Sequence, residues 1–191
     1  MEKNLDLYEY SKAMSEVKLI RWKDLPQIPL YCDQLLQIVN AQLSFLQVDD
    51  EMLITKSMVN NYVKLAMMPK PEKKKYEKLH LAYAIVITIL KQVLPITKIK
   101  DGIQLQVILQ GNERAYDAFC EALEESIRMV FSHVLDKGEP YIIEERKIEH
   151  DKLALSSITT ALSNMLLTEK IIETKIKRFN KPDTGEGEAH E

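Results

Sequence analysis

A nearly all-round apolar segment constrains the fold of this chain more than any other feature of its sequence. Residues 76–94, YEKLHLAYAIVITILKQVL, carry apolar side chains on almost every face of a helix, and Pro95 ends that helix. A helix of this kind needs other elements to cover it on several sides. Its longest apolar stretch, residues 81–90, is about half of what a membrane span requires. The sequence therefore predicts a central helix within a helical protein.

Further segments show apolar residues at helical spacing, so the predicted fold class is predominantly all-α. The segment 96–109 is either one helix or two short pieces around Gly102, and the segment 137–149 is compatible with a short strand. Thr55 is the expected N-cap of a helix over about 56–66, which must end before the prolines of PKP at residues 69–71. The expected helices, besides the central one, span about 30–46, 56–66, 112–136 and 150–178.

Composition excludes several classes of protein. With 191 residues, 46% of them hydrophobic and 29% charged, the chain can bury a core and resembles an ordinary soluble protein. No glycine precedes Gly102, which excludes a phosphate-binding glycine loop in the first half. Cys32 and Cys120 are far apart and are expected as buried free thiols. The N-terminus lacks the apolar core of a signal peptide, so we expect a cytoplasmic protein with no membrane contact.

Positive charge is concentrated in one part of the chain. The net charge is −3, but residues 56–100 carry ten basic and two acidic side chains, giving +8. The segments on either side are acidic, with −4 over residues 1–55 and −7 over residues 101–191. A local field of this sign favours polyanionic partners whatever the overall charge.

The basic part contains a short helix with a polar face. On a helical wheel the side chains of Ser57, Asn60, Asn61 and Lys64 share one face, while Met58, Val59, Tyr62, Val63 and Ala66 lie opposite and would dock the helix. Asn forms paired hydrogen bonds with adenine, Ser reaches bases or phosphate, and Lys reaches guanine or phosphate. This face suits the major groove of DNA. The alternative to DNA binding is that this polar face is simply the solvent-exposed side of a surface helix.

A compact basic loop follows this helix in the segment MMPKPEKKKY, where prolines stiffen the backbone and lysines are placed to contact phosphate. His80 lies one helical turn after Tyr76, where it either touches phosphate or packs against the loop. The candidate DNA-binding residues are Lys56, Ser57, Asn60, Asn61, Lys64, Lys70, Lys73, Lys74, Lys75 and Tyr76.

The stretch ITKSMVNNYVKLAMMPKPEKKKYEKLHLAYAIVITILKQVLPITKI resembles the DNA-binding unit of MerR-type regulators. Tyr62 matches the aromatic residue of their recognition helix, PKPEKKKY stands for the wing, and PITKI for the start of the next helix. Their wing carries Arg and Gly beside its Tyr, whereas this chain has lysines and a glutamate. More closely, the region around residues 22–110 is similar to an uncharacterised family of low-GC Gram-positive bacteria, described as a domain of unknown function and suspected to be MerR-like. The resemblance implies a winged helix-turn-helix regulator.

No catalytic arrangement is evident in the sequence. The carboxylate groups at 49–51, 124–125 and 144–145 are adjacent along the chain, so on a helix they point about 100° apart and form no acid–base pair. No Ser-His-Asp set can be assembled from residue spacing, and no cofactor motif is present. We therefore do not expect an enzyme.

These observations predict four parts: an N-terminal arm over 1–21, a MerR-like helix-turn-helix domain over 22–110, a C-terminal helical hairpin or dimerisation segment over 111–179, and a disordered acidic tail over 180–191. The expected function is sequence-specific binding of double-stranded DNA by a homodimer that regulates transcription. The alternative is a protein–protein interaction module whose basic loop binds an acidic partner protein. A small-molecule effector that acts through the C-terminal helices is compatible with the first hypothesis.

Overall fold

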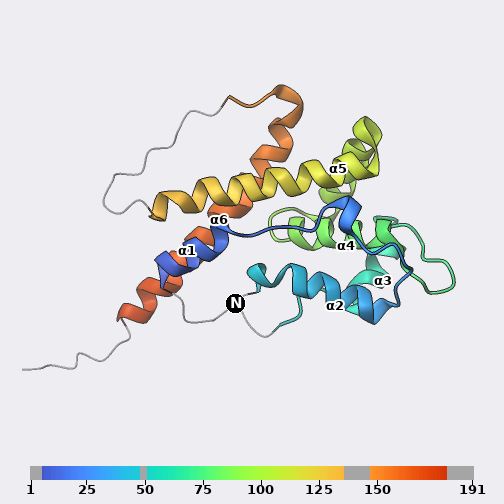
Figure 1. Ribbon diagram of the computed structural model, residues 1–191, viewed down its shortest axis with the longest axis horizontal. Helices are drawn as coiled ribbons and strands as arrows, with labels where there is room; N and C mark the ends of the chain where they lie inside the picture. Colours follow the sequence, from blue (N-terminus) through green and yellow to red (C-terminus); the bar gives the residue numbers. More distant parts are fainter. Residues whose placement is uncertain (1–5, 48–50, 136–146, 180–191) are drawn as a thin grey trace, which may run out of the picture.

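The computed structural model describes residues 6–47, 51–135 and 147–179. Within these ranges the regular structure is helical, which confirms the predicted all-α class, and the β contacts are isolated bridges at Leu30–Tyr76 and Glu72–Lys75. The elements in chain order are α1 (Leu7–Ser15), η1 (Trp22–Asp24), α2 (Cys32–Gln42), η2 (Ser44–Leu46), α3 (Lys56–Lys64), α4 (Lys78–Leu90), α5 (Ile96–Leu135), η3 (His150–Lys152) and α6 (Leu153–Phe179) (Figure 1).

Helix α4 is the central helix that its apolar sequence predicts. Leu81, Ala84, Ile85, Ile87 and Ile89 are all fully buried. Burial of each large aliphatic side chain contributes roughly 1.5–3 kcal/mol. The helix is shorter than the predicted 76–94 because Tyr76 pairs with another segment and Lys91 already forms the C-cap.

Helix α5 contains a sharp kink at Gly111, where the backbone has φ 80° and ψ 165°. A positive φ of this size is open to glycine and strained for other residues. The break therefore comes at Gly111, and the segment 96–110 is one continuous helical piece with Gly102 inside it. The kink divides α5 into a first half, residues 96–110, and a second half, residues 112–135.

The second half of α5 packs against α1 and α6. Ser126 Oγ lies 2.8 Å from Thr159 Oγ1. Further along α5 and α6, the Tyr10 ring of α1 packs edge-on against Phe131 of α5, with 5.7 Å between the ring centroids. Lys170 Nζ of α6 lies 5.0 Å from the centroid of the same Tyr10 ring. The two long helices thus cross while running in the same general direction (Figure 1). Of the two predicted forms of this segment, a helical hairpin or a dimerisation segment, the hairpin is therefore not observed. The connection over residues 136–152 is long enough to let the second helix run in the same direction as the first.

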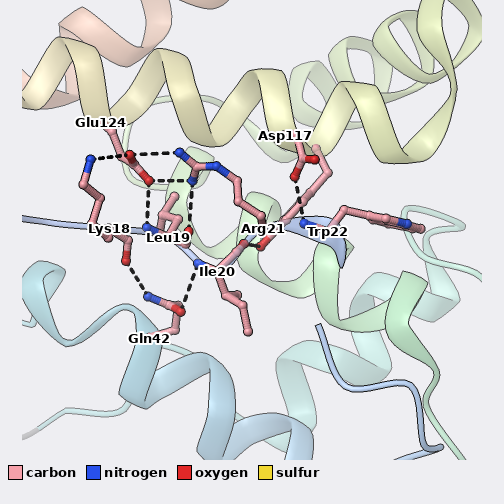
Figure 2. A network of polar contacts seen from close by, with 9 residues as sticks. Lys18, Leu19, Ile20, Arg21, Trp22, Gln42, Asp117 and Glu124 are labelled. Atoms are coloured by element: carbon pink, nitrogen blue, oxygen red, sulfur yellow. Dashed lines mark hydrogen bonds and ion pairs between the residues drawn. The ribbon is translucent and has the colours of Figure 1, made fainter. Parts of the chain in front are cut away.

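The expected N-terminal arm is an integral part of the fold. Helix α1 begins at an Asp6 N-cap and buries Met14 completely. The segment that follows is tied to α5 on one side: Glu124 accepts hydrogen bonds from Lys18 Nζ at 3.1 Å and from the Leu19 N–H at 2.9 Å (Figure 2). Arg21 approaches the same carboxylate with two nitrogens, at 2.6 and 3.0 Å.

On its other side the same segment is tied to α2. The Gln42 side chain donates to the Lys18 carbonyl at 2.9 Å and accepts from the Ile20 N–H at 3.2 Å (Figure 2). The Trp22 N–H then donates to Asp117 Oδ1 at 2.8 Å. Residues 18–22 therefore form a strap, which connects α2 on one side to the second half of α5 on the other.

No helix within the described residues is long and apolar enough to cross a membrane. The predicted acidic tail, residues 180–191, lies outside those residues, and so does most of the possible strand segment 137–149.

Candidate nucleic-acid interface

Helix α3 docks with one face and exposes the other. Thr55 Oγ1 accepts from the Met58 N–H at 3.4 Å and so forms the predicted N-cap. Val59 and Tyr62 are buried, with exposures of 0 and 3%, because they point into the core of the molecule. The side chains on the remaining face are exposed to solvent: Lys56, Ser57, Asn60, Asn61 and Lys64.

The C-terminus of α3 is closed by a left-handed residue. Ala66 has φ 52°, and the Met67 N–H donates back to the Tyr62 carbonyl at 2.9 Å. This is the hydrogen bond of a Schellman cap, in which glycine is the usual left-handed residue. Lys100 of α5 donates to the Leu65 carbonyl at 3.0 Å, so the helix end is also held from the next part of the chain.

The connection that precedes α3 is fixed by two side chains that sequence reasoning missed. Asn40 of α2 accepts from the Leu53 N–H at 2.8 Å and donates to the Ile54 carbonyl at 3.2 Å. Lys91, at the end of α4, donates to the Leu53 carbonyl, and burial lowers the pKa of its ammonium group. These contacts set the position of α3 relative to α2 and α4. Neither residue belongs to a motif, so no local signal identified them.

The basic loop is a tight hairpin. The Lys75 N–H donates to the Glu72 carbonyl at 2.7 Å, and the two residues between them, Lys73 and Lys74, have φ angles of 46° and 61°. Two positive φ angles in a two-residue loop are the mark of a type I′ turn, which favours Asn-Gly. Both lysine side chains are exposed. The tip of the hairpin therefore holds two cations in a backbone conformation that lysine disfavours.

The base of the hairpin is anchored to the segment before α2. Leu30 and Tyr76 exchange two backbone hydrogen bonds, of 2.7 and 2.8 Å, as an antiparallel pair. Lys75 Nζ lies 4.1 Å from the centroid of the exposed Tyr31 ring, which restrains this lysine. Tyr76 is 5% exposed, and burial raises the pKa of its phenol. Of the candidate contact residues, Tyr76 thus lies in the interior and Lys75 is only half-buried.

His80 lies below the hairpin as a packing residue. It is 5% exposed, its Nδ1 accepts from the Glu77 N–H at 2.9 Å, and its ring meets Tyr76 edge-on at 5.5 Å. Burial lowers the pKa of the imidazole, because the charged form loses solvation there. Of the two roles considered for His80, the placement is that of packing.

The hairpin follows helix α3 directly along the chain. Residues 65–71 connect them directly, and the loop projects from the end of the molecule where α3 lies (Figure 1). Lys70, between the prolines, is exposed like the lysines of the tip. Among the described residues, no carboxylate forms an ion pair with Lys56, Lys64, Lys70, Lys73 or Lys74. These cations remain available to an anionic partner.

Comparison with known proteins identifies one relationship. Residues 20–120 match the family model described as "Domain of unknown function (DUF1836)". No curated protein and no solved structure matches the chain. The matched region runs from the strap through α2, α3, the hairpin and α4 into the second half of α5, and it covers more than half of the chain. The expected membership of an uncharacterised family is therefore confirmed: the chain belongs to the DUF1836 family.

Proposed function

We propose that this protein is a cytoplasmic transcriptional regulator that binds double-stranded DNA in a sequence-specific manner through a MerR-like winged helix-turn-helix unit. Helix α3 is the recognition helix, which places Ser57, Asn60, Asn61 and Lys64 in the major groove. The hairpin around Lys73 and Lys74 is the wing, which contacts flanking phosphates.

The observation that carries this proposal is the conformation of the hairpin tip. A non-glycine residue in the left-handed region costs roughly 1–2 kcal/mol, and two lysines occupy that region in succession. Backbone strain that persists at an exposed position is concentrated at functional sites. A loop with Asn-Gly would form the same turn without this cost. The lysines therefore contribute something other than stability, and two adjacent exposed cations suit a polyanion.

The order and attachment of the elements support the same proposal. A helix (α2), a second helix (α3), a hairpin and a buried helix (α4) follow one another, and the hairpin base pairs with the segment before α2 through Leu30 and Tyr76. Asn40, Lys91 and Lys100 hold α3 at both ends. A recognition element must be rigid to read bases, because small displacements break bidentate hydrogen bonds.

A second copy of the chain would supply the other half-site. Leu105, Ile108 and Leu109, on the first half of α5, are 54, 80 and 66% exposed and share one helix face. An exposed apolar patch of this kind marks an interaction surface. Helix-turn-helix proteins bind two half-sites about one helical turn of DNA apart as dimers. We propose that this patch is the dimer contact.

Selection from a random pool of duplex DNA tests the proposed function. The wild-type chain is expected to enrich a defined sequence at low salt, and Asn60→Ala/Asn61→Ala is expected to lose that preference while retaining salt-dependent binding. If the basic surface binds an acidic protein instead, no DNA sequence is enriched and the double substitution has no effect on the selection. The absence of any enriched sequence would overturn the proposal.

A further inference from the structure

An apolar groove, half open to solvent, is formed by α4, both halves of α5 and the start of α6. Its volume is about 190 Å³, and its representative residues are Val86 of α4, Ile103 and Phe119 of the two halves of α5, and Ile158 of α6. Of the described residues that line it, Lys98 alone carries a charge. Apolar surface that stays open to solvent marks a place where another molecule binds.

The groove is continuous with the exposed apolar patch of Leu105, Ile108 and Leu109. Leu105 belongs to both, because it lines the groove and is itself exposed. The patch lies within the run 102–112, GIQLQVILQGN, which contains no charged residue although 29% of the chain is charged. Charge is depleted in the same way at the centre of protein–protein interfaces. The occupant of the groove is therefore an uncharged apolar surface, and neither a polyanion nor an acidic protein fits it.

The chain cannot fill its own groove with this patch. Ile99 lines the groove, and Ile108 follows nine residues later on the same helix, which is about two and a half turns and so the opposite side. The first half of α5 thus turns one apolar side to the groove and another to solvent. A second copy can place its patch in this groove and receive the patch of the first copy in return, which is the reciprocal contact of a two-fold dimer.

We infer that Ile108 and Leu109 of each copy insert into the groove of the other copy, so that the patch contacts the partner's groove rather than the partner's patch. The sizes agree: a space of roughly 150 Å³ holds benzene, which is larger than the side chain of Ile or Leu. A groove of about 190 Å³ has room for one such side chain and part of a second. This inference rests on the homodimer in the proposed function but not on DNA binding, so its test contains no DNA.

Trp22 allows the occupation of the groove to be observed directly. It is the one tryptophan of the chain, and it lines the groove. Quenching of its fluorescence by acrylamide is expected to fall as the protein concentration rises, with the association constant that sedimentation equilibrium gives for the dimer. Quenching that stays constant while sedimentation shows a dimer would overturn the inference and leave the homodimer standing.

Exchange of charge between patch and groove supplies the second measurement. Ile108→Glu on the patch and Ala154→Lys on the groove, both at exposed positions, are each expected to weaken the dimer at least about tenfold, because each places a charge in an apolar contact. Mixing the two variants is expected to restore association at least about tenfold, since each mixed dimer has one native contact and one Glu–Lys contact.

Ala41→Lys, at an exposed position of α2 that does not line the groove, is the matched control and is expected to associate like wild type. A wild-type chain that stays monomeric at high concentration overturns both the homodimer and this inference. If Ala154→Lys associates as tightly as wild type, or if the mixture recovers no association, the groove is not the contact and only this inference is overturned.

Discussion

Arg21 and Glu124 form a two-pronged ion pair that connects the N-terminal strap to α5, with Nη1–Oε1 and Nη2–Oε2 distances of 2.6 and 3.0 Å. The carboxylate is almost fully buried, with 3% of its side chain exposed. Planar bidentate pairs of this kind are the strongest ion pairs in proteins. Because residues 18–22 also contact α2, this pair links the proposed DNA-binding unit to the C-terminal helices.

Removal of Arg21 is expected to destabilise the fold. Arg21→Met leaves a buried carboxylate without its main partner, and the expected loss in the free energy of unfolding is about 3 kcal/mol. Lys18→Met removes a partner of the same carboxylate whose own side chain is 65% exposed, so a loss below about 1 kcal/mol is expected. Urea denaturation measures both losses. Equal effects of the two substitutions would contradict this account of the strap.

The stability of the protein is expected to fall in acid because of Glu124. Burial alone would raise its pKa, but the hydrogen bonds from Arg21, the Leu19 N–H and Lys18 hold it at about 2, against an ordinary value of 4.5. A depressed pKa contributes stability above about pH 4.5, and that stability is lost as the pH falls toward 2. We expect Glu124 to account for about 2 kcal/mol of this loss.

Denaturation of wild type and of Glu124→Gln at pH values between 6 and about 2 isolates this contribution. The amide does not titrate in this range, so the difference in stability between the two proteins is expected to shrink as the pH falls. A difference that stays constant across the range would show that Glu124 does not carry the effect.

Ala66→Gly is expected to stabilise the protein by about 1 kcal/mol. Ala66 has φ 52° at the C-cap of α3, where glycine avoids the steric cost of the left-handed conformation. Ala118→Gly, inside the second half of α5, is the matched control and is expected to destabilise by about 1 kcal/mol. Thermal and urea unfolding give both values. A loss of stability in Ala66→Gly would show that this end of α3 adopts another conformation.

Ile108→Glu is expected to convert the proposed dimer into a monomer. The side chain is 80% exposed in the single chain, so the substitution has little effect on folding but places a charge in the proposed contact. Ile172→Glu on α6, at a position 52% exposed, is the control and should leave the association unchanged. Sedimentation equilibrium measures the association constant. A wild-type chain that stays monomeric at high concentration would rule out this contact.

The local elements of the fold were predictable from the sequence, whereas their long-range connections were not. Thr55 marked the start of α3, and the apolar run identified α4, because helix caps and apolar spacing are local properties. Arg21, the partner of Glu124, lies 103 residues earlier in the chain. At Glu124 itself the sequence shows only a pair of adjacent acidic residues. Only the fold brings Arg21 and Glu124 together.

Two features of the candidate site show the same limit. The sequence placed a possible break of this helix at Gly102, whereas the residue with the positive φ is Gly111. At the hairpin tip, Lys73 and Lys74 occupy positions where a sequence-based prediction expects Asn and Gly, so the loop could be predicted to be basic but not to be a type I′ turn. Functional positions are where local preference and observed conformation are expected to disagree.

The salt dependence of DNA binding by Lys73→Asn/Lys74→Gly tests the central claim most directly. The substitution supplies the favoured turn residues, so the free energy of unfolding is expected to rise while two phosphate contacts are lost. With the duplex selected by wild type, the slope of log K against log salt is expected to decrease in magnitude by about 1.8. Lys12→Asn/Lys175→Asn removes the same charge from exposed sites on α1 and α6 and is expected to leave the slope unchanged. Equal slopes for the hairpin variant and wild type, or no duplex selected at low salt, would contradict the account.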